Sequence, residues 1–364
     1  MINSNTSFGK LKEVIVGREL EIPKRIADFS FQHFYQENLN EPVYERLYSD
    51  GEEYYVNHEI LVKRNKQLDR LEQLLEEFGI KVHRPDKLKK IIPFKTPHFK
   101  SELSSASNVR DLSLIYNICI IETPTFCQNR YFENVSLYRI YNNGFNGGKG
   151  GLWIRPPHTK LTKETMDLQH WNSKRDYKNF DREKYTMAID GAQYLRIGVD
   201  VIVNINSYNH YLGHEWIKSF FPKTKFHIVH LTDNHIDGVI TCLCPGVFLV
   251  NPLFPNIKES MPGKFKNWKY LIPEEDTKPF KLEKGMTSLD IQLASARGMD
   301  MNVLSLNEKT VMVNNRAKNV IKLLEDNNFE VIKVELDNCE IFGGGIGCST
   351  LDLVRDDKLM DYTK

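Results

Sequence analysis

One cysteine stands behind a glycine-rich run late in the sequence. The run FGGGIGCST places three consecutive glycines, 343–345, and then Gly347 in front of Cys348. Glycine adopts backbone angles that other residues avoid, and it lets a ligand approach the chain closely. Cys348 is therefore a candidate nucleophile, because its sulfur must reach a substrate without neighbouring side chains in the way. A buried structural thiol beside a turn is the alternative.

A cysteine nucleophile needs a group that takes and returns a proton, and a histidine can do this. In the segment TDNHIDG, His235 stands two residues before Asp237, at the entrance to an apolar run. If this segment is extended, both side chains point to the same face. His235 and Asp237 are therefore candidates for one pocket. A polar turn before a strand is the alternative.

Two further carboxylates enter apolar runs in the same way. Asp111 begins the segment DLSLIY, and Asp190 precedes GAQYLRI. Each alone is typical of a solvated turn, but a repeat-built fold could gather such positions at one centre. Carboxylates gathered there would suit a planar cation such as guanidinium, which they bind through paired hydrogen bonds.

Two other kinds of site are weaker candidates. His210 and His214 are four residues apart on a predicted helix, but HEW lacks the second histidine of a zinc HExxH motif. GFNGGKGG, residues 144–151, has Gly150 where a phosphate-binding loop needs serine or threonine. We therefore expect no metal and no nucleotide.

Composition excludes several classes of protein. The 364 residues carry 49 Lys and Arg against 48 Asp and Glu, a net charge of +1, so no strong field favours nucleic acid or an anionic membrane. No apolar run approaches the roughly 20 residues that span a bilayer, and the first residues lack an apolar signal core. Six cysteines in 364 residues do not form a disulfide scaffold. We expect a cytoplasmic protein.

Helix and strand patterns repeat along the chain. LLEEFGIKVHRP, residues 74–85, and LLEDNNFEVIKVEL, residues 323–336, each join the end of an amphipathic helix to a strand. Predicted helices lie at 54–79, 211–222 and 315–328; single strands at 11–17, 80–85, 225–231 and 329–337; and paired strands at 111–123, 237–251 and 301–314. This self-similarity predicts one repeat-built α/β domain over residues 1–364, with an irregular insertion around 130–185.

The motifs together resemble the arginine amidinotransferases, the family of glycine amidinotransferase. The resemblance runs in family order over nearly the whole chain. Its segments are LKEVIVG, VRDLSLIYNICIIETP, RYFEN, IDGAQYLRIGVDVIV, YLGHEW, HIDGVITCLCPGVFLVNP, MNVLSLNEKTVMV and GGGIGCSTLDLVR.

The resemblance implies a fold and an activity. The fold is the pentein α/β-propeller, five ββαβ units with pseudo-fivefold symmetry and the active site at the centre. The activity is transfer of the amidino group of L-arginine to an acceptor amine through a covalent amidino-cysteine, with release of L-ornithine. The reaction needs no cofactor or metal, and the partners are these small molecules and a second copy of the chain in a homodimer.

The resemblance also implies residue roles. Cys348 matches the family nucleophile, His235 its general acid and base, and Asp190 the carboxylate paired with that histidine. Asp111 and Asp237 match the carboxylates that bind the guanidinium. We expect the cationic substrate and an imidazolium to favour the reactive thiolate.

Substrate binding beyond the guanidinium depends on other positions. Arg130, in RYFEN, is a further expected substrate-binding residue. Phe254 stands where the glycine enzyme has an arginine that holds the carboxylate of the donor, and Ser295 with Ala296 replaces a pair of serines. We therefore expect an acceptor other than glycine. An arginine-hydrolysing pentein, a deiminase or dihydrolase, and a non-catalytic binder of guanidino compounds are the alternatives.

Overall fold

The structure is a computed structural model that describes residues 2–22, 24–30, 52–145, 151–169, 174–232, 235–275 and 299–364. Within these ranges, five three-stranded sheets have the same construction. In each, two antiparallel strands are followed by a helix and by a third strand that runs parallel to the second. The chain therefore contains five ββαβ units.

The first unit takes its strands from both ends of the described chain, whereas the other four follow one another in sequence. The first consists of β19 (Thr350–Asp356), β1 (Lys10–Val16), α3 (His58–Glu77) and β4 (Lys81–His83). The second consists of β7 (Ser113–Tyr116), β8 (Cys119–Glu122), α4 (Tyr138–Phe145) and β9 (Leu152–Ile154). The third consists of β10 (Tyr194–Ile197), β11 (Asp200–Asn204), α5 (Tyr208–Lys218) and β12 (Lys225–Val229).

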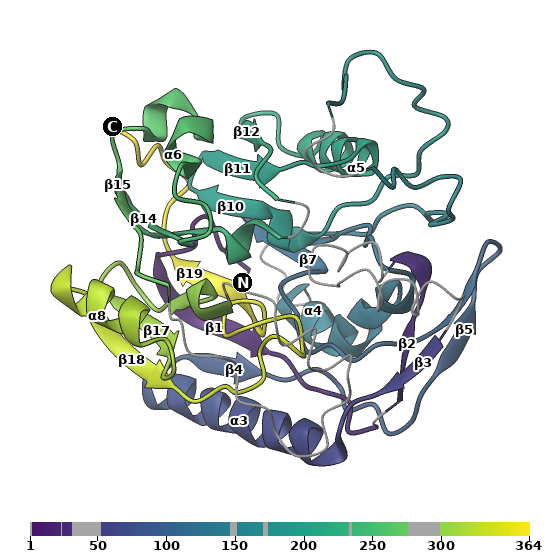
Figure 1. Ribbon diagram of the computed structural model, residues 1–364, viewed down its shortest axis with the longest axis horizontal. Coiled ribbons are helices and arrows are strands. Elements are labelled where there is room, and N and C mark those ends of the chain that lie inside the picture. The colour runs from purple at the N-terminus through teal and green to yellow at the C-terminus, as the bar shows by residue number, and fades with distance from the viewer. Residues whose placement is uncertain are drawn as a thin grey trace.

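The fourth unit consists of β13 (Ile240–Cys244), β14 (Val247–Val250), α6 (Ile257–Ser260) and β15 (Lys269–Leu271). The fifth consists of β16 (Leu304–Ser305), β17 (Thr310–Asn314), α8 (Lys318–Asp326) and β18 (Glu330–Val334). Two small hairpins lie outside the units: β2 (Lys24–Ala27) with β3 (Glu52–Tyr55), and β5 (Pro93–Lys95) with β6 (Lys100–Glu102). The units surround a common centre, with helices α3, α5, α6 and α8 at the periphery (Figure 1).

Apolar side chains fill the space between each unit and the next. Leu351 of the first unit shares a cluster with Ile115 of the second, and similar clusters join the second to the third, the third to the fourth and the fourth to the fifth. A fifth cluster joins Met312 of the last unit to Val14 of the first. These five apolar interfaces follow one another in cyclic order and therefore close the units into a ring. In this arrangement, each sheet buries both of its faces.

The predicted helices and strands overlap those of the structure, although their ends shift by up to four residues and α6 and β15 were not predicted. The helix predicted from residue 54 begins at His58, because residues 54 and 55 pair in β3 and the Asn57 side chain accepts a hydrogen bond from the Glu59 amide at 2.8 Å. The irregular stretch expected around 130–185 begins after β9, since α4 and β9 complete the second unit.

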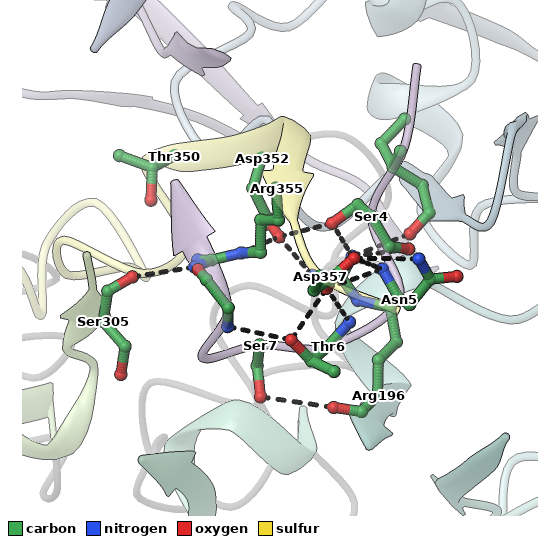
Figure 2. Close-up of polar contacts among 12 residues, drawn as sticks. Ser4, Asn5, Thr6, Ser7, Arg196, Ser305, Thr350, Asp352, Arg355 and Asp357 are labelled. Carbon is green, nitrogen blue, oxygen red and sulfur yellow. Dashed lines mark hydrogen bonds and ion pairs between the residues drawn. The ribbon is translucent and has the colours of Figure 1, made fainter. Parts of the chain in front are cut away.

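A buried ionic network surrounds Asp352 of β19 and connects several units of the ring. The fully buried carboxylate of Asp352 lies 2.5 Å from Arg196 Nη2, 2.7 Å from Arg355 Nε and 3.0 Å from Arg110 Nη2. Figure 2 shows Ser4 in the same network, where its hydroxyl donates to Asp352 Oδ2 at 2.9 Å. The network therefore joins the first three units to the N-terminal segment.

We expect Asp352→Asn to destabilise the protein by about 3–5 kcal/mol, because removing one partner leaves buried guanidinium groups uncompensated. The measurement is the free energy of unfolding in urea. Asp326→Asn is the control, since Asp326 pairs with Lys322 at an exposed position and should change stability little. Equal stability of the two variants would contradict the prediction.

Candidate active site

Each ββαβ unit contributes a polar residue just before its first strand. These residues precede their strands by two to four positions. They are Cys348 before β19, Asp111 before β7, Asp190 before β10, Asp237 before β13 and Asn302 before β16. Because the first strands are equivalent positions of the ring, their entrances meet at its centre. The repeat thus brings five distant segments together in one site.

The histidine of the site is held between two carboxylates. His235 Nε2 lies 3.0 Å from Asp190 Oδ2, and His235 Nδ1 lies 3.6 Å from Asp111 Oδ1. The segments of the two aspartates cross closely, because the amide of Gly191 donates to the carbonyl of Asp111. A Cβ at Gly191 would lie 2.6 Å from the carbonyl oxygen of Ser113, so glycine is required at this crossing.

The sulfur of Cys348 has two polar neighbours. Its thiol donates to Asp237 Oδ2 at 3.1 Å, and Asn302 Nδ2 donates to the sulfur at 3.1 Å. Asn302 Nδ2 also donates to Asp237 Oδ2 at 3.1 Å, and Asn302 Oδ1 accepts from the amide of Cys348 at 2.7 Å. Cys348, Asp237 and Asn302 therefore form one hydrogen-bonded group.

The glycines before Cys348 have definite steric roles. Gly343 has φ 60°, which favours glycine. A Cβ at Gly344 would lie 2.7 Å from the Cβ of Cys348, and a Cβ at Gly347 would lie 2.9 Å from Asn302 Oδ1. The space beside Gly344 and Gly347 is thus occupied by protein side chains.

Three more side chains hold the glycine-rich loop from outside. Buried Arg64 of α3 donates to the carbonyl of Gly344 at 2.9 Å and to the hydroxyl of Ser349 at 2.8 Å. Arg110 Nε donates to the carbonyl of Gly347 at 2.7 Å, and Asn108 Nδ2 to that of Phe342 at 2.7 Å. These contacts fix the backbone on both sides of the cysteine.

Burial and charge set the protonation states. Burial lowers the pKa of His235, but Asp111 and Asp190 outweigh burial and raise that pKa to about 9. Burial raises the pKa of the Cys348 thiol well above its ordinary value, and the carboxylates of Asp237 and Asp111 raise it further. The resting site therefore holds an imidazolium and a neutral thiol at neutral pH.

Arg130 orients one of the carboxylates. Its Nη1 donates to Asp111 Oδ2 at 2.7 Å, while its Nε and Nη2 donate to Glu133. Burial raises the pKa of Glu133 to about 7 although Arg130 opposes this. Asp111 Oδ1 is buried and accepts no hydrogen bond from any residue that the structure describes. One oxygen of Asp111 is thus held by protein and the other faces His235.

The other predicted substrate-binding positions are Phe254 and Ser295. Phe254 packs partly buried against an apolar cluster that contains Ile240 and Phe248. Ser295 and Ala296 lie outside the described residues. The substrate-binding roles of Phe254 and Ser295 stay predictions.

The two histidines of the rival zinc motif are both buried beside aromatic rings. His214 lies 3.3 Å from the hydroxyl of Tyr194, and burial lowers its pKa to about 3. The ring of His210 lies edge-on to that of Phe126. No group of three His, Cys, Asp or Glu side chains within the described ranges could hold a metal ion. Most of the glycine-rich stretch 144–151 lies outside those ranges.

Among the described helices, none is long and apolar enough to cross a membrane.

Asn302 was not predicted from the sequence. The asparagine lies in MNVLSL, whose place before a strand matches that of the four other site residues. Comparing the entrances of the repeated strands would have revealed it. An uncharged amide at this position does not by itself suggest a catalytic role. Its position before a strand was the feature that could have indicated one.

Comparisons with known proteins agree with this fold. No family model matches the chain. An L-arginine:L-lysine amidinotransferase of Pseudomonas savastanoi pv. phaseolicola is 28% identical over 303 residues, which cover 82% of this chain and 80% of that protein. The mitochondrial glycine amidinotransferase of Gallus gallus is 26% identical over 375 residues, covering 99% and 84%. The solved inosamine-phosphate amidinotransferase of Streptomyces griseus is 25% identical, with a TM-score of 0.82 over 100% of this chain and 99% of that chain.

Five ββαβ units in a ring define the pentein class, and the expected fold is confirmed. Within that class, the chain is similar to the amidinotransferases. The relatives support amidinotransferase activity, and thus a transferase that acts on small molecules.

Proposed function

We propose that the protein transfers the amidino group of L-arginine to an amine other than glycine, by way of an amidino group on Cys348, and releases L-ornithine. The observation that carries the proposal is the grouping of Cys348, His235 and three carboxylates at the centre of the ring. Thiol, imidazole and carboxylates are the groups that covalent transfer from a guanidinium requires.

Asp111 and Asp237 suit the guanidinium of the donor. Asp111 Oδ1 is a buried acceptor without a hydrogen bond from the described residues. Asp237 Oδ2 contacts the thiol of Cys348 at 3.1 Å, so a cation bound to Asp237 would lie beside the sulfur. Two carboxylates around a planar cation would hold its central carbon near the nucleophile.

Binding of the cation activates the thiol. Asp237 and Asp111 raise the pKa of Cys348 in the resting site, after burial itself. A guanidinium between the same carboxylates compensates their negative charge, which lowers the pKa of the thiol and favours the thiolate. The nucleophile is therefore reactive chiefly when the donor is present.

In the first half-reaction, the Cys348 thiol, made more acidic by the bound guanidinium, releases its proton to solvent. The thiolate attacks the central guanidinium carbon and forms a carbon–sulfur bond. His235 then donates its proton to the nitrogen that departs. Because Asp190 holds Nε2, the transferring atom is Nδ1, which faces Asp111. The carbon–nitrogen bond breaks, its electron pair stays on nitrogen, and ornithine leaves as an amine.

In the second half-reaction, the acceptor amine attacks the carbon of the amidino thioether. Neutral His235 accepts a proton from the attacking nitrogen, and the carbon–sulfur bond breaks with its electron pair on sulfur. The thiolate and the imidazolium are restored, so one histidine serves as acid and then as base. Ping-pong kinetics are expected.

The names of the relatives fit arginine as donor and leave several acceptors. One relative is named for lysine and another for glycine. Phe254 packs partly buried against an apolar cluster and presents no charge that would bind a carboxylate. We therefore propose an acceptor longer or less acidic than glycine.

We expect kcat/KM for lysine, diamines or amino alcohols to exceed that for glycine by roughly tenfold or more at fixed arginine, because one absent charge-assisted hydrogen bond costs about 1.5–3 kcal/mol. The measurement is guanidino product formed from each amine. Glycine as the best acceptor would disprove this specificity. Citrulline formed from arginine alone would favour a hydrolase instead.

The homodimer and the cytoplasmic location belong to the same proposal. A pair of identical subunits is the expectation from the family resemblance. Light scattering of the purified chain tests it, with a monomer at micromolar concentration as the contrary result.

A further inference from the structure

We propose that Asn302 is a further catalytic residue, whose side-chain amide donates to the sulfur of Cys348 and stabilises it as the attacking thiolate. The inference rests on the proposed covalent role of Cys348. Asn302 Nδ2 lies 3.1 Å from the sulfur, and within the described ranges no other hydrogen-bond donor contacts that atom. Asn302 is itself buried, so water competes little for its amide.

The orientation of this amide follows from its partners. The amide N–H of Cys348 is a donor only, so the atom of Asn302 that faces it at 2.7 Å must be the carbonyl oxygen. The NH₂ group then points to the sulfur and to Asp237 Oδ2. A flipped amide would place two donors against each other. The backbone of the nucleophile therefore directs the donor at the sulfur of the same residue.

The glycines beside Asn302 support this arrangement. A Cβ at Gly345 would lie 2.9 Å from the Cβ of Asn302, and a Cβ at Gly347 would lie 2.9 Å from its Oδ1. Larger residues at either position would push the amide away from Cys348. The glycine-rich run thus provides room for the asparagine.

A neutral donor is well suited to this position. The charged groups that act on the Cys348 sulfur include Asp237 and Asp111, which disfavour the thiolate, and Arg110, which favours it. A lysine in place of Asn302 would repel the cationic donor and pair with Asp237. An amide stabilises the anion without either effect. When the thiol loses its proton, its bond to Asp237 is lost, whereas the bond from Asn302 strengthens because the acceptor is charged.

The test is the pH dependence of Cys348 alkylation by iodoacetamide, followed by peptide mass spectrometry. Asn302→Asp keeps an acceptor for the Cys348 amide but removes the donor, and Asn302→Leu removes both. For each variant we expect the alkylation midpoint to rise by about one to two pH units, corresponding to about 10- to 100-fold less thiolate below the midpoint. A purely structural role would change the rate at all pH values and leave the midpoint in place.

Asn314→Asp is the matched control. Asn314 is a buried asparagine whose amide lies 3.6 Å from the sulfur of another cysteine, Cys339. This variant should keep the Cys348 midpoint of the wild type. Wild-type midpoints in both Asn302 variants would overturn the inference. This readout needs no turnover, so it is separable from the proposed function, which fails if arginine leaves no adduct on wild-type Cys348.

Discussion

Cys348→Ala is expected to lose transfer activity by about 10⁴- to 10⁶-fold, the scale on which removal of a covalent nucleophile acts. No other described thiol has an equivalent place: Cys242, for example, is fully buried in β13. Cys348→Ser should be almost as inactive, because the hydroxyl is far less easily ionised than the thiol. Neither change should unfold the ring, since both replacements are smaller than or similar to cysteine.

The measurements are ornithine release and the mass of the Cys348 peptide after incubation with arginine alone. Wild-type protein should carry an added amidino group, and the alanine variant should carry none. Cys242→Ala is the control that keeps both turnover and the adduct. Substantial transfer by Cys348→Ala would eliminate the covalent mechanism.

His235→Asn is expected to slow the reaction by about 10²- to 10⁴-fold, the usual range for a general acid and base. Because carboxylates hold the His235 pKa at about 9, the wild type should lose ornithine release as pH rises through 9. Asparagine can still donate to Asp190 but cannot transfer a proton. The variant should therefore lack this alkaline limb.

The raised pKa also predicts how stability changes with pH. A histidine whose folded pKa exceeds its unfolded value of about 6.5 stabilises the protein fully below that value. This contribution falls as pH rises from about 6.5 through 9. The free energy of unfolding should therefore decrease over that window in the wild type more than in His235→Asn.

His214→Asn is the control for both measurements. His214 is also buried, but its pKa is lowered to about 3, so it stays neutral throughout the window. Its replacement should change stability without changing the pH profile. An alkaline limb that survives in His235→Asn would assign the proton transfer to another group.

The sequence predicted the frame of the ring because each unit repeats the same order of strand and helix patterns. Strand β9 was not predicted, because it has only three residues and follows an Asn- and Gly-rich stretch. Cys348, His235 and the three aspartates have reactive or charged side chains, so they can be recognised from the sequence as candidate site residues. Asn302 does not, since its part depends on one amide lying between a backbone N–H and a sulfur from another unit.

The sequence also could not reveal what the glycines accommodate. Their expected purpose was the approach of a ligand, whereas the structure places Asn108 and Asn302 beside them. The role of Arg64 was hidden for a similar reason. An arginine in an amphipathic helix normally reaches solvent, but this one is buried against the loop of the nucleophile.

The pairing of β19 with β1 has a consequence for how the protein is made. Cys348 stands two residues before a strand whose partner is Lys10–Val16, so its loop gains the support of this pairing only after these distant segments meet. Such pairing closes a very long loop and is slow to form. On the ribosome, four units could assemble before the first is complete. The nucleophile would be the last part of the site to be positioned. A nascent chain would therefore be inactive until the ring closes.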